Sequence, residues 1–163
     1  MKKFVFALVF AFLGLVVATN AQNPNVVAEP EYSGVFYLRG EKGLVALLRV
    51  TPEIKARFKA SLALPSHIPA EVETPIFVVK LDGTGDPTSM FMLAPVEDGK
   101  KISAKFSSAV IFTKGIGVSL RPLGNNRTFE VTPASPLSAG EYGIAVRSNT
   151  PFSVPEVFLF RVK

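Results

Sequence analysis

Short apolar segments alternate with turn-forming residues from residue 33 to the C-terminus, and this pattern restricts the fold more than any other feature of the chain. The segments cover residues 35–39, 44–50, 75–81, 90–94, 101–106, 116–121, 127–132, 141–147 and 156–163. Turns such as Gly124-Asn125-Asn126 separate them, and glycine and asparagine adopt the positive φ angles of tight hairpins. Regularly spaced short strands are typical of an all-β sandwich or barrel, so we expect an antiparallel β-sandwich.

The order of apolar and polar residues within each segment predicts which strands are covered on one face and which on both. Residues 116–121, 127–132 and 141–147 alternate, which is typical of strands that bury one face. Residues 76–79 and 90–93 are apolar on both faces. We therefore expect these two to be central strands or to lie beneath a covering segment. Hairpins are expected for 35–39 with 44–50, 90–94 with 101–106, and 116–121 with 127–132.

Residues 54–64 fit two secondary structures. Thr51-Pro52-Glu53 offers an N-cap threonine and a proline at the first helical position, and apolar residues follow at a spacing of four. Strict alternation of apolar with polar residues runs through the same stretch. We favour a strand, because a long period-two pattern arises less easily by chance than three apolar residues at helical spacing.

The N-terminus has the form of a secretory signal peptide. Lys2 and Lys3 precede an apolar run over residues 4–18, and Thr19 and Ala21 supply the small residues that a signal peptidase requires. The run is shorter than the roughly 20 residues that span a bilayer core, so an uncleaved anchor is the less favoured alternative. We expect residues 1–21 to be the signal peptide, 22–32 a flexible lead-in and 33–163 a single domain. The expected location is extracytoplasmic: periplasmic, cell-surface or secreted, and bacterial.

Charge and cysteine content restrict the partners of the exported chain. Removal of Lys2 and Lys3 leaves 16 basic and 13 acidic residues, so the net charge falls from +5 to +3. This charge suits weak attraction to anionic surfaces and lacks the density of a nucleic-acid binder. The chain has no cysteine, which excludes lipid attachment at a mature N-terminal cysteine and requires the core alone to stabilise the fold. We expect no membrane span after signal cleavage.

Leu137-Ser138-Ala139-Gly140-Glu141-Tyr142 has the form L-x-x-G-x-Y. It resembles the tyrosine corner of immunoglobulin-like and fibronectin type III-like Greek-key sandwiches, in which the tyrosine hydroxyl bonds to the backbone a few residues upstream. The resemblance covers residues 75–163 and implies a structural corner formed by Leu137, Gly140 and Tyr142. It implies an immunoglobulin-like Greek-key sandwich with extra N-terminal strands before residue 65. The chain has no tryptophan and no cysteine pair, so it is not an antibody-type domain.

Weaker similarities concern the biological setting. Residues 75–78, the Asp86-Pro87 turn and Gly140-Glu141-Tyr142 are loosely similar to uncharacterised bacterial envelope proteins, which implies no chemistry. The closing residues Phe160-Arg161-Val162-Lys163 resemble the end of immunoglobulin-like bacterial sorting domains. An export-related C-terminal sorting domain is therefore one of the functional alternatives.

Residues suited to catalysis or metal binding are few. Cysteine chemistry is impossible, and the single histidine, His67, lies in a proline-bracketed segment typical of a surface loop, without a G-x-S-x-G motif elsewhere. Asp82-Gly83-Thr84-Gly85-Asp86 lacks the further acidic ligands of a calcium loop, so we interpret it as a turn. The sequence predicts no catalytic residue, no cofactor and no metal, although 13 carboxylates keep a carboxylate-dependent hydrolase open as an alternative.

The strongest binding candidate is the basic row Lys55, Arg57 and Lys59. On one strand these residues would stand about 7 Å apart on one face, a spacing suited to anionic groups of an envelope polymer or an acidic protein. The alternative is a solvated face or a guarded sheet edge. Taken together, the sequence predicts a non-enzymatic binding or accessory module of the cell envelope.

Overall fold

Residues 28–55, 59–97, 101–102, 104–106, 110–112, 114–124, 126–147 and 155–163 are described in the computed structural model of this chain. The described residues are essentially all-β and contain no α-helix; a single 3₁₀ turn, η1, covers Pro87–Ser89. No helix in the described part of the chain is long and apolar enough to cross a membrane. The expected signal peptide and the first part of the lead-in lie outside the described residues.

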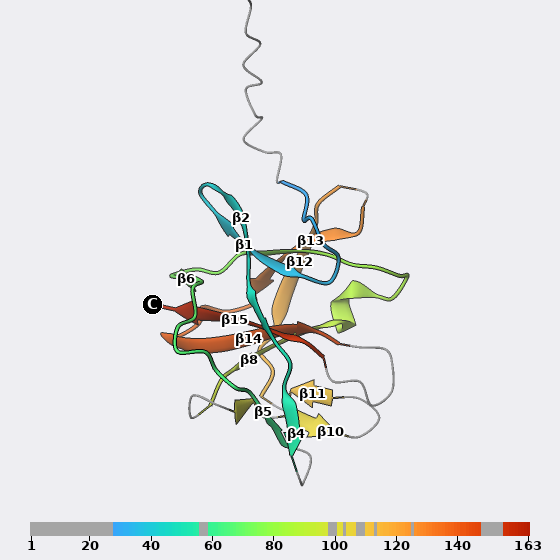
Figure 1. The fold of residues 1–163 in the computed structure, drawn as a ribbon. Coiled ribbons are helices and arrows are strands. Elements are labelled where there is room, and N and C mark those ends of the chain that lie inside the picture. The colour runs from blue at the N-terminus through green and yellow to red at the C-terminus, as the bar shows by residue number, and fades with distance from the viewer. Residues whose placement is uncertain are drawn as a thin grey trace, which may run out of the picture.

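Two main sheets form the body of the domain (Figure 1). Sheet A has the order β12 (Val118–Pro122), β13 (Thr128–Pro133), β7 (Phe77–Lys80), β1 (Phe36–Gly40) and β2 (Gly43–Ala46). Sheet B has the order β3 (Leu48–Val50), β15 (Val157–Val162), β14 (Gly140–Val146) and β8 (Phe91–Pro95), and β6 (Glu71–Val72) pairs with β15. All of these pairs are antiparallel except β6 with β15.

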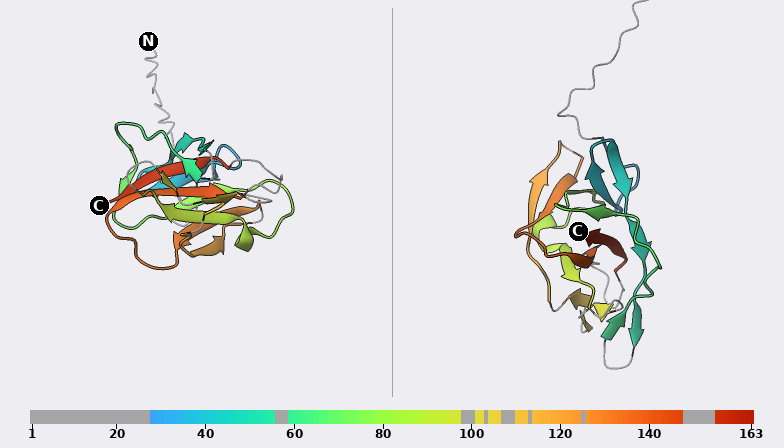
Figure 2. Two further views of the ribbon diagram at one scale, coloured as in Figure 1. Left: turned by 90° about the horizontal axis from the view of Figure 1, so that it is seen from below. Right: turned by 90° about the vertical axis from the view of Figure 1, so that its left-hand side faces the viewer.

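Two small groups of strands lie at the opposite end of the molecule from the β1–β2 hairpin (Figures 1 and 2). One consists of β4 (Glu53–Lys55), β5 (Lys59–Ser61) and β9 (Lys101–Ile102), and the other of β10 (Ala104–Phe106) and β11 (Val110–Phe112). The expected hairpin of 90–94 with 101–106 is wrong. Instead, β8 pairs with β14, and Lys101–Ile102 pairs with β5.

The inner faces of sheets A and B share one hydrophobic core. Phe36 of β1 is fully buried, and its ring lies 5.8 Å from that of Phe91 and 5.4 Å from that of Phe158, both in sheet B. Phe77 of β7 likewise contacts Phe160 of β15, at 4.8 Å between ring centroids. Aromatic pairs at these separations favour tilted and edge-on packing, so these rings hold the two sheets face to face.

The strands that are apolar on both faces are covered on both, as the sequence predicted. Strand β7 lies between β13 and β1 in sheet A. The outer face of sheet B forms a second apolar cluster, in which Leu62 and Ile68 of the segment before β6 cover the sheet; its sheet members are Met92, Ala94, Ala145, Val157 and Leu159. The burial of Ala145 makes one expectation wrong, because β14 is buried on both faces rather than one.

The chain crosses from one sheet to the other at two places, once on each side of the domain. Residues 44–50 were expected to form one strand, but the chain leaves sheet A after β2 and enters sheet B at β3, with Leu47 buried at the crossing. On the other side, the Ile116 N–H donates to the Leu93 carbonyl of sheet B before the chain enters sheet A as β12. The expected hairpins of β1 with β2 and of β12 with β13 are confirmed.

Residues 54–64 do not form the single strand that we favoured. Strands β4 and β5 pair antiparallel, and their register places Ile54 opposite Ala60 and Lys55 opposite Lys59. Residues 56–58 between the two strands lie outside the described residues. The strand prediction is therefore confirmed for residues 54–55 and 59–61, whereas residues 62–64 are not in a strand.

Candidate functional site

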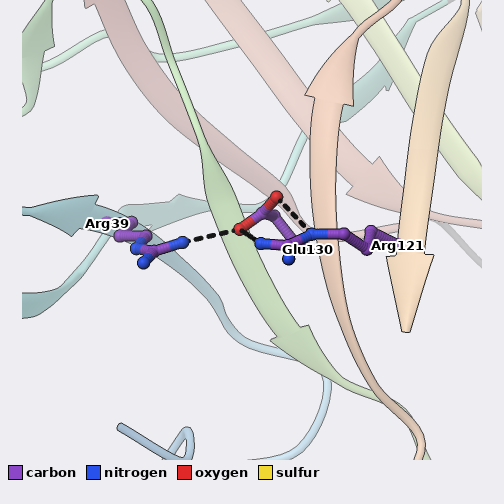
Figure 3. Close-up of polar contacts among 3 residues, drawn as sticks. All are labelled: Arg39, Arg121 and Glu130. Carbon is purple, nitrogen blue, oxygen red and sulfur yellow. Dashed lines mark hydrogen bonds and ion pairs between the residues drawn. The ribbon is translucent and has the colours of Figure 1, made fainter. Parts of the chain in front are cut away.

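The outer face of sheet A brings two arginines onto one carboxylate (Figure 3). Arg121 of β12 binds Glu130 of β13 through two hydrogen bonds, Nε to Oε1 at 2.9 Å and Nη2 to Oε2 at 2.7 Å. Arg39 of β1 adds a third, from Nη1 to Oε2 at 2.8 Å. We call these three residues the arginine face.

The electrostatics of the arginine face follow from this geometry. The Glu130 side chain is 12% exposed, whereas those of Arg39 and Arg121 are 35% and 62% exposed. Hydrogen bonding to Arg121 is the largest cause that lowers the pKa of Glu130, and Arg39 lowers it further, although burial acts in the opposite direction. Glu130 is thus an anion at neutral pH, and the group carries one net positive charge on an exposed surface.

The arginine face also lies beside a buried apolar residue. Glu130 and Tyr37 are the direct cross-strand neighbours of Val78 in β7, and Val78 has no exposed surface although it belongs to the outer face. Long arginine side chains cover apolar surface with their stems while their charged ends remain in water. The stems of Arg39 and Arg121 are long enough to cover this apolar surface.

The N-terminal segment that was expected to be flexible contacts the same sheet. Glu29 accepts a 2.6 Å hydrogen bond from Lys80 and a longer one from Asn126, and Pro30 is buried. The Gly34 N–H donates to the Lys80 carbonyl. These contacts join Glu29 and Gly34 to Lys80 of β7. Residues 22–27 of the expected lead-in lie outside the described residues.

The predicted basic row is only partly described. Lys55 lies in β4 and Lys59 in β5, opposite each other in the register of this hairpin, and Arg57 lies outside the described residues. The backbone therefore brings positions 55 and 59 together across two strands instead of along one. The hairpin and the arginine face come from different sheets, and Figure 1 places the hairpin at the far end of the molecule from the β1–β2 turn.

The predicted corner residues meet at the start of β14. The Tyr142 hydroxyl donates a 2.8 Å hydrogen bond to the Ser138 carbonyl, and the Tyr142 ring stacks on Phe160 at 5.6 Å. Leu137 is partly buried against the core. Gly140 has a φ of +156°, a conformation available mainly to glycine.

A shallow hollow of about 280 Å³ lies beside the corner. Its lining consists of Glu73, Thr74, Pro75, Thr132, Pro133, Ala134, Ser135, Pro136 and Leu137. The three prolines have no N–H group, and Glu73 is the only ionisable side chain of the lining. The hydroxyls of Thr74, Thr132 and Ser135 can both donate and accept hydrogen bonds, and the lining does not contain three histidine, cysteine or acidic residues that could hold a metal ion.

Several carboxylates of the described residues have structural partners. Arg161 of β15 binds Glu141 at 2.6 Å and Glu71 at 3.3 Å. Asp86 accepts hydrogen bonds from the N–H and hydroxyl of Thr88 and caps the 3₁₀ turn. His67 is exposed, as expected of a surface-loop histidine. Within the described ranges no three histidine, cysteine or acidic residues cluster as metal ligands would.

The arginine face was not predicted as a site from the sequence. Alternation placed Arg121 and Glu130 on the polar faces of one hairpin, which was a usable signal for their ion pair. Arg39 is 91 residues from Glu130, and its position becomes clear only when β1 is known to be two strands from β13 in sheet A. No protein family, curated protein or solved structure matches the chain.

Proposed function

We propose that this chain is an extracytoplasmic, non-enzymatic binding or accessory module of the bacterial cell envelope, built on an immunoglobulin-like Greek-key sandwich. The leader-like N-terminus supports the location. The hydrogen bond from Tyr142 to Ser138 supports the architecture, because the corner tyrosine begins the penultimate strand β14, which pairs with the last strand β15.

The observation that carries the binding proposal is the excess of guanidinium over carboxylate on the outer face of sheet A. Glu130 neutralises only one of its two arginine partners, and Arg121 remains 62% exposed. Guanidinium groups bind carboxylate, phosphate and sulfate oxygens through paired hydrogen bonds. The partner is therefore an anionic envelope polymer or an acidic protein surface, held by attraction that salt screens.

The pKa shifts of the carboxyls favour binding over hydrolysis. A general acid in glycoside hydrolysis needs a raised pKa. The carboxyls of Glu29, Asp86 and Glu130 are all shifted in the opposite direction, by hydrogen bonds from Lys80, Thr88 and Arg121 respectively. These three carboxylates are anions at neutral pH, so none of them is suited to act as a general acid.

Binding to vesicles that contain lipopolysaccharide tests this proposal. Arg121→Ser should weaken binding roughly two- to fivefold at low salt, the range expected for one exposed charge. Glu130→Gln should strengthen it, because both guanidiniums lose their internal anion. Arg49→Ser is the matched control: Arg49 is 59% exposed and forms an ion pair with Glu156, but it lies on sheet B.

The β4–β5 hairpin, which carries the predicted basic row, is tested in the same assay by replacing Lys55, Arg57 and Lys59 together with serine. The binding proposal expects weaker binding and a flatter salt dependence in this variant as well. Equal affinity of the Arg121, Glu130 and Arg49 variants at every salt concentration would contradict a role for the arginine face. Unchanged binding of the triple variant would leave the hairpin as a solvated surface.

A further inference from the structure

Strand β2 is an end strand of sheet A that lacks the usual protection against pairing with another strand. Natural proteins guard such edges with charged residues or proline. Among the edge strands of sheets A and B, β12 contains Arg121 and Pro122, β3 contains Arg49, β6 contains Glu71, and β8 contains Pro95. The sequence of β2 is Gly-Leu-Val-Ala, with neither a charge nor a proline.

The hydrogen bonds of neighbouring strands show which main-chain groups of β2 point away from the sheet. The Leu47 N–H donates to the Phe36 carbonyl, whereas the Arg39 N–H donates to Ile76 on the other side of β1. Hydrogen-bonded and non-hydrogen-bonded pairs alternate along an antiparallel ladder. In the register of β1 with β2, Val45 therefore bonds to Leu38, and the N–H and C=O groups of Leu44 and Ala46 face outward without a partner strand among the described residues.

The side chain of Val45 adds an apolar element to this edge. Val45 is 56% exposed, one of two large hydrophobic residues in the described chain with such exposure. It lies opposite Leu38, which belongs to the core. Val45 thus extends the apolar surface of the core to the uncovered edge of sheet A. Figure 1 shows the β1–β2 hairpin projecting from the domain.

We propose that β2 pairs antiparallel with β2 of a second copy of this chain, about a two-fold axis at Val45. In this register Leu44 of one copy lies opposite Ala46 of the other, and their outward groups exchange both main-chain hydrogen bonds. Val45 then faces its own counterpart as a non-hydrogen-bonded pair, in which side chains come closest. One strand thereby satisfies its backbone groups and covers its exposed valine, which a self-complementary interface requires.

Charge at the ends of this pairing is compatible with a second copy. The turn before β2 carries Glu41 and Lys42, and it approaches the partner copy near the residues that lead into β3. That region carries Arg49, which forms an ion pair with Glu156. Each end of the pairing therefore brings together positive and negative groups. At the centre, β2 has no charged residue that would repel its own copy across the two-fold axis.

Amide hydrogen exchange combined with sedimentation of the exported mature chain tests this interface. The proposal expects a monomer–dimer equilibrium over an approximately hundredfold range of protein concentration. The amides of Leu44 and Ala46 should become protected as the dimer forms. The Val45 amide serves as an internal reference, because it bonds to β1 in both states.

Two variants separate the interface from the stability of the monomer. Ala46→Pro removes an outward N–H without removing a bond to β1, and Val45→Lys places like charges at the two-fold axis. Each should weaken dimerisation by roughly tenfold or more, with circular dichroism unchanged. Ser119→Lys, an exposed position on the guarded edge strand β12, is the control and should leave the dimer intact.

Three results would overturn the proposal. The first is a wild-type chain that stays monomeric at every concentration. The second is a dimer in which the Leu44 and Ala46 amides exchange as fast as in the monomer, because its interface would lie elsewhere. The third is a dimer that both edge variants leave unchanged.

Discussion

The hydroxyl of Tyr142 donates a 2.8 Å hydrogen bond to the backbone carbonyl of Ser138, four residues earlier in the chain. This bond closes the loop that leads from sheet A into β14. Tyr142 is 6% exposed, and its ring stacks on that of Phe160. One side chain thus joins loop geometry to core packing, and the two contributions are separable by mutation.

Removing the hydroxyl alone tests the loop contribution. Tyr142→Phe keeps the ring and should lower the free energy of unfolding by about 1 kcal/mol. The cost is modest because Ser138 is exposed and water can reach its carbonyl. Tyr142→Ala also opens a cavity and should cost about 3–5 kcal/mol. Equilibrium denaturation measures both values, and wild-type stability of Tyr142→Phe beside a large loss in Tyr142→Ala would reduce Tyr142 to an ordinary core aromatic.

Gly140 should be intolerant of β-branched residues for a backbone reason. Its φ of +156° lies in a region that L-residues rarely adopt. A Cβ at this position would meet the Tyr142 ring at 3.7 Å, an ordinary contact, so a steric clash is not the cause. Gly140→Val should therefore cost about 1–3 kcal/mol in denaturation experiments. A variant as stable as the wild type would show that the turn does not need glycine.

Glu130 should make part of the stability depend on pH. Its pKa in the folded state is lowered below the ordinary 4.5, first through hydrogen bonding to Arg121. A lowered folded pKa gives stability that is present above the unfolded pKa and is lost as pH falls through the folded value. Glu130→Gln should thus be about 1 kcal/mol less stable than wild type at pH 7, and this difference should shrink below pH 4.5.

Urea denaturation over a pH series measures that difference. The matched control is Glu156→Gln, since Glu156 is 46% exposed in its pair with Arg49 and exposed pairs contribute little. A Glu130→Gln difference that is constant from neutral to acid pH would contradict the assignment of this pH dependence to Glu130.

Periodicity predicted individual strands well and the sheets less well. The alternation in residues 116–121 and 127–132 placed Ser119 and Arg121 on the exposed face, as observed. In contrast, which strands pair depends on contacts between distant residues. The expected pairing of 90–94 with 101–106 relied on their proximity in sequence, whereas β8 pairs with β14, about 50 residues away.

The error over residues 54–64 has a specific geometric cause. In the β4–β5 hairpin, Ile54 pairs with Ala60 and Glu53 with Ser61, so even-numbered positions lie opposite even-numbered ones. A turn with this parity continues the same alternation from one strand to the next. One long strand and this hairpin therefore have identical period-two patterns, and periodicity alone does not distinguish them.

The candidate site was less predictable than the corner. The L-x-x-G-x-Y motif is local, since Ser138 and Tyr142 are four residues apart. The arginine face joins β1 to a hairpin that begins about 80 residues later. Arg39 reaches Glu130 only because of the order of strands in sheet A. The pattern of apolar and polar residues does not specify that order.

Processing of the N-terminus is a separate prediction. Thr19-Asn20-Ala21 follows a short apolar run, so cleavage after Ala21 should give a mature chain that begins at Gln22. Mass spectrometry of the exported protein measures this directly. A stable full-length form retained in the membrane would contradict an extracytoplasmic, soluble product.

Backbone NMR of the mature chain, titrated with lipopolysaccharide fragments that carry phosphate groups, tests the proposed binding function most directly. The account predicts saturable shifts at Arg39, Arg121 and Glu130, with salt-dependent affinity and no comparable change around Arg49 on sheet B. Shifts that are absent at saturating ligand, or that map away from both the outer face of sheet A and the β4–β5 hairpin, would contradict it.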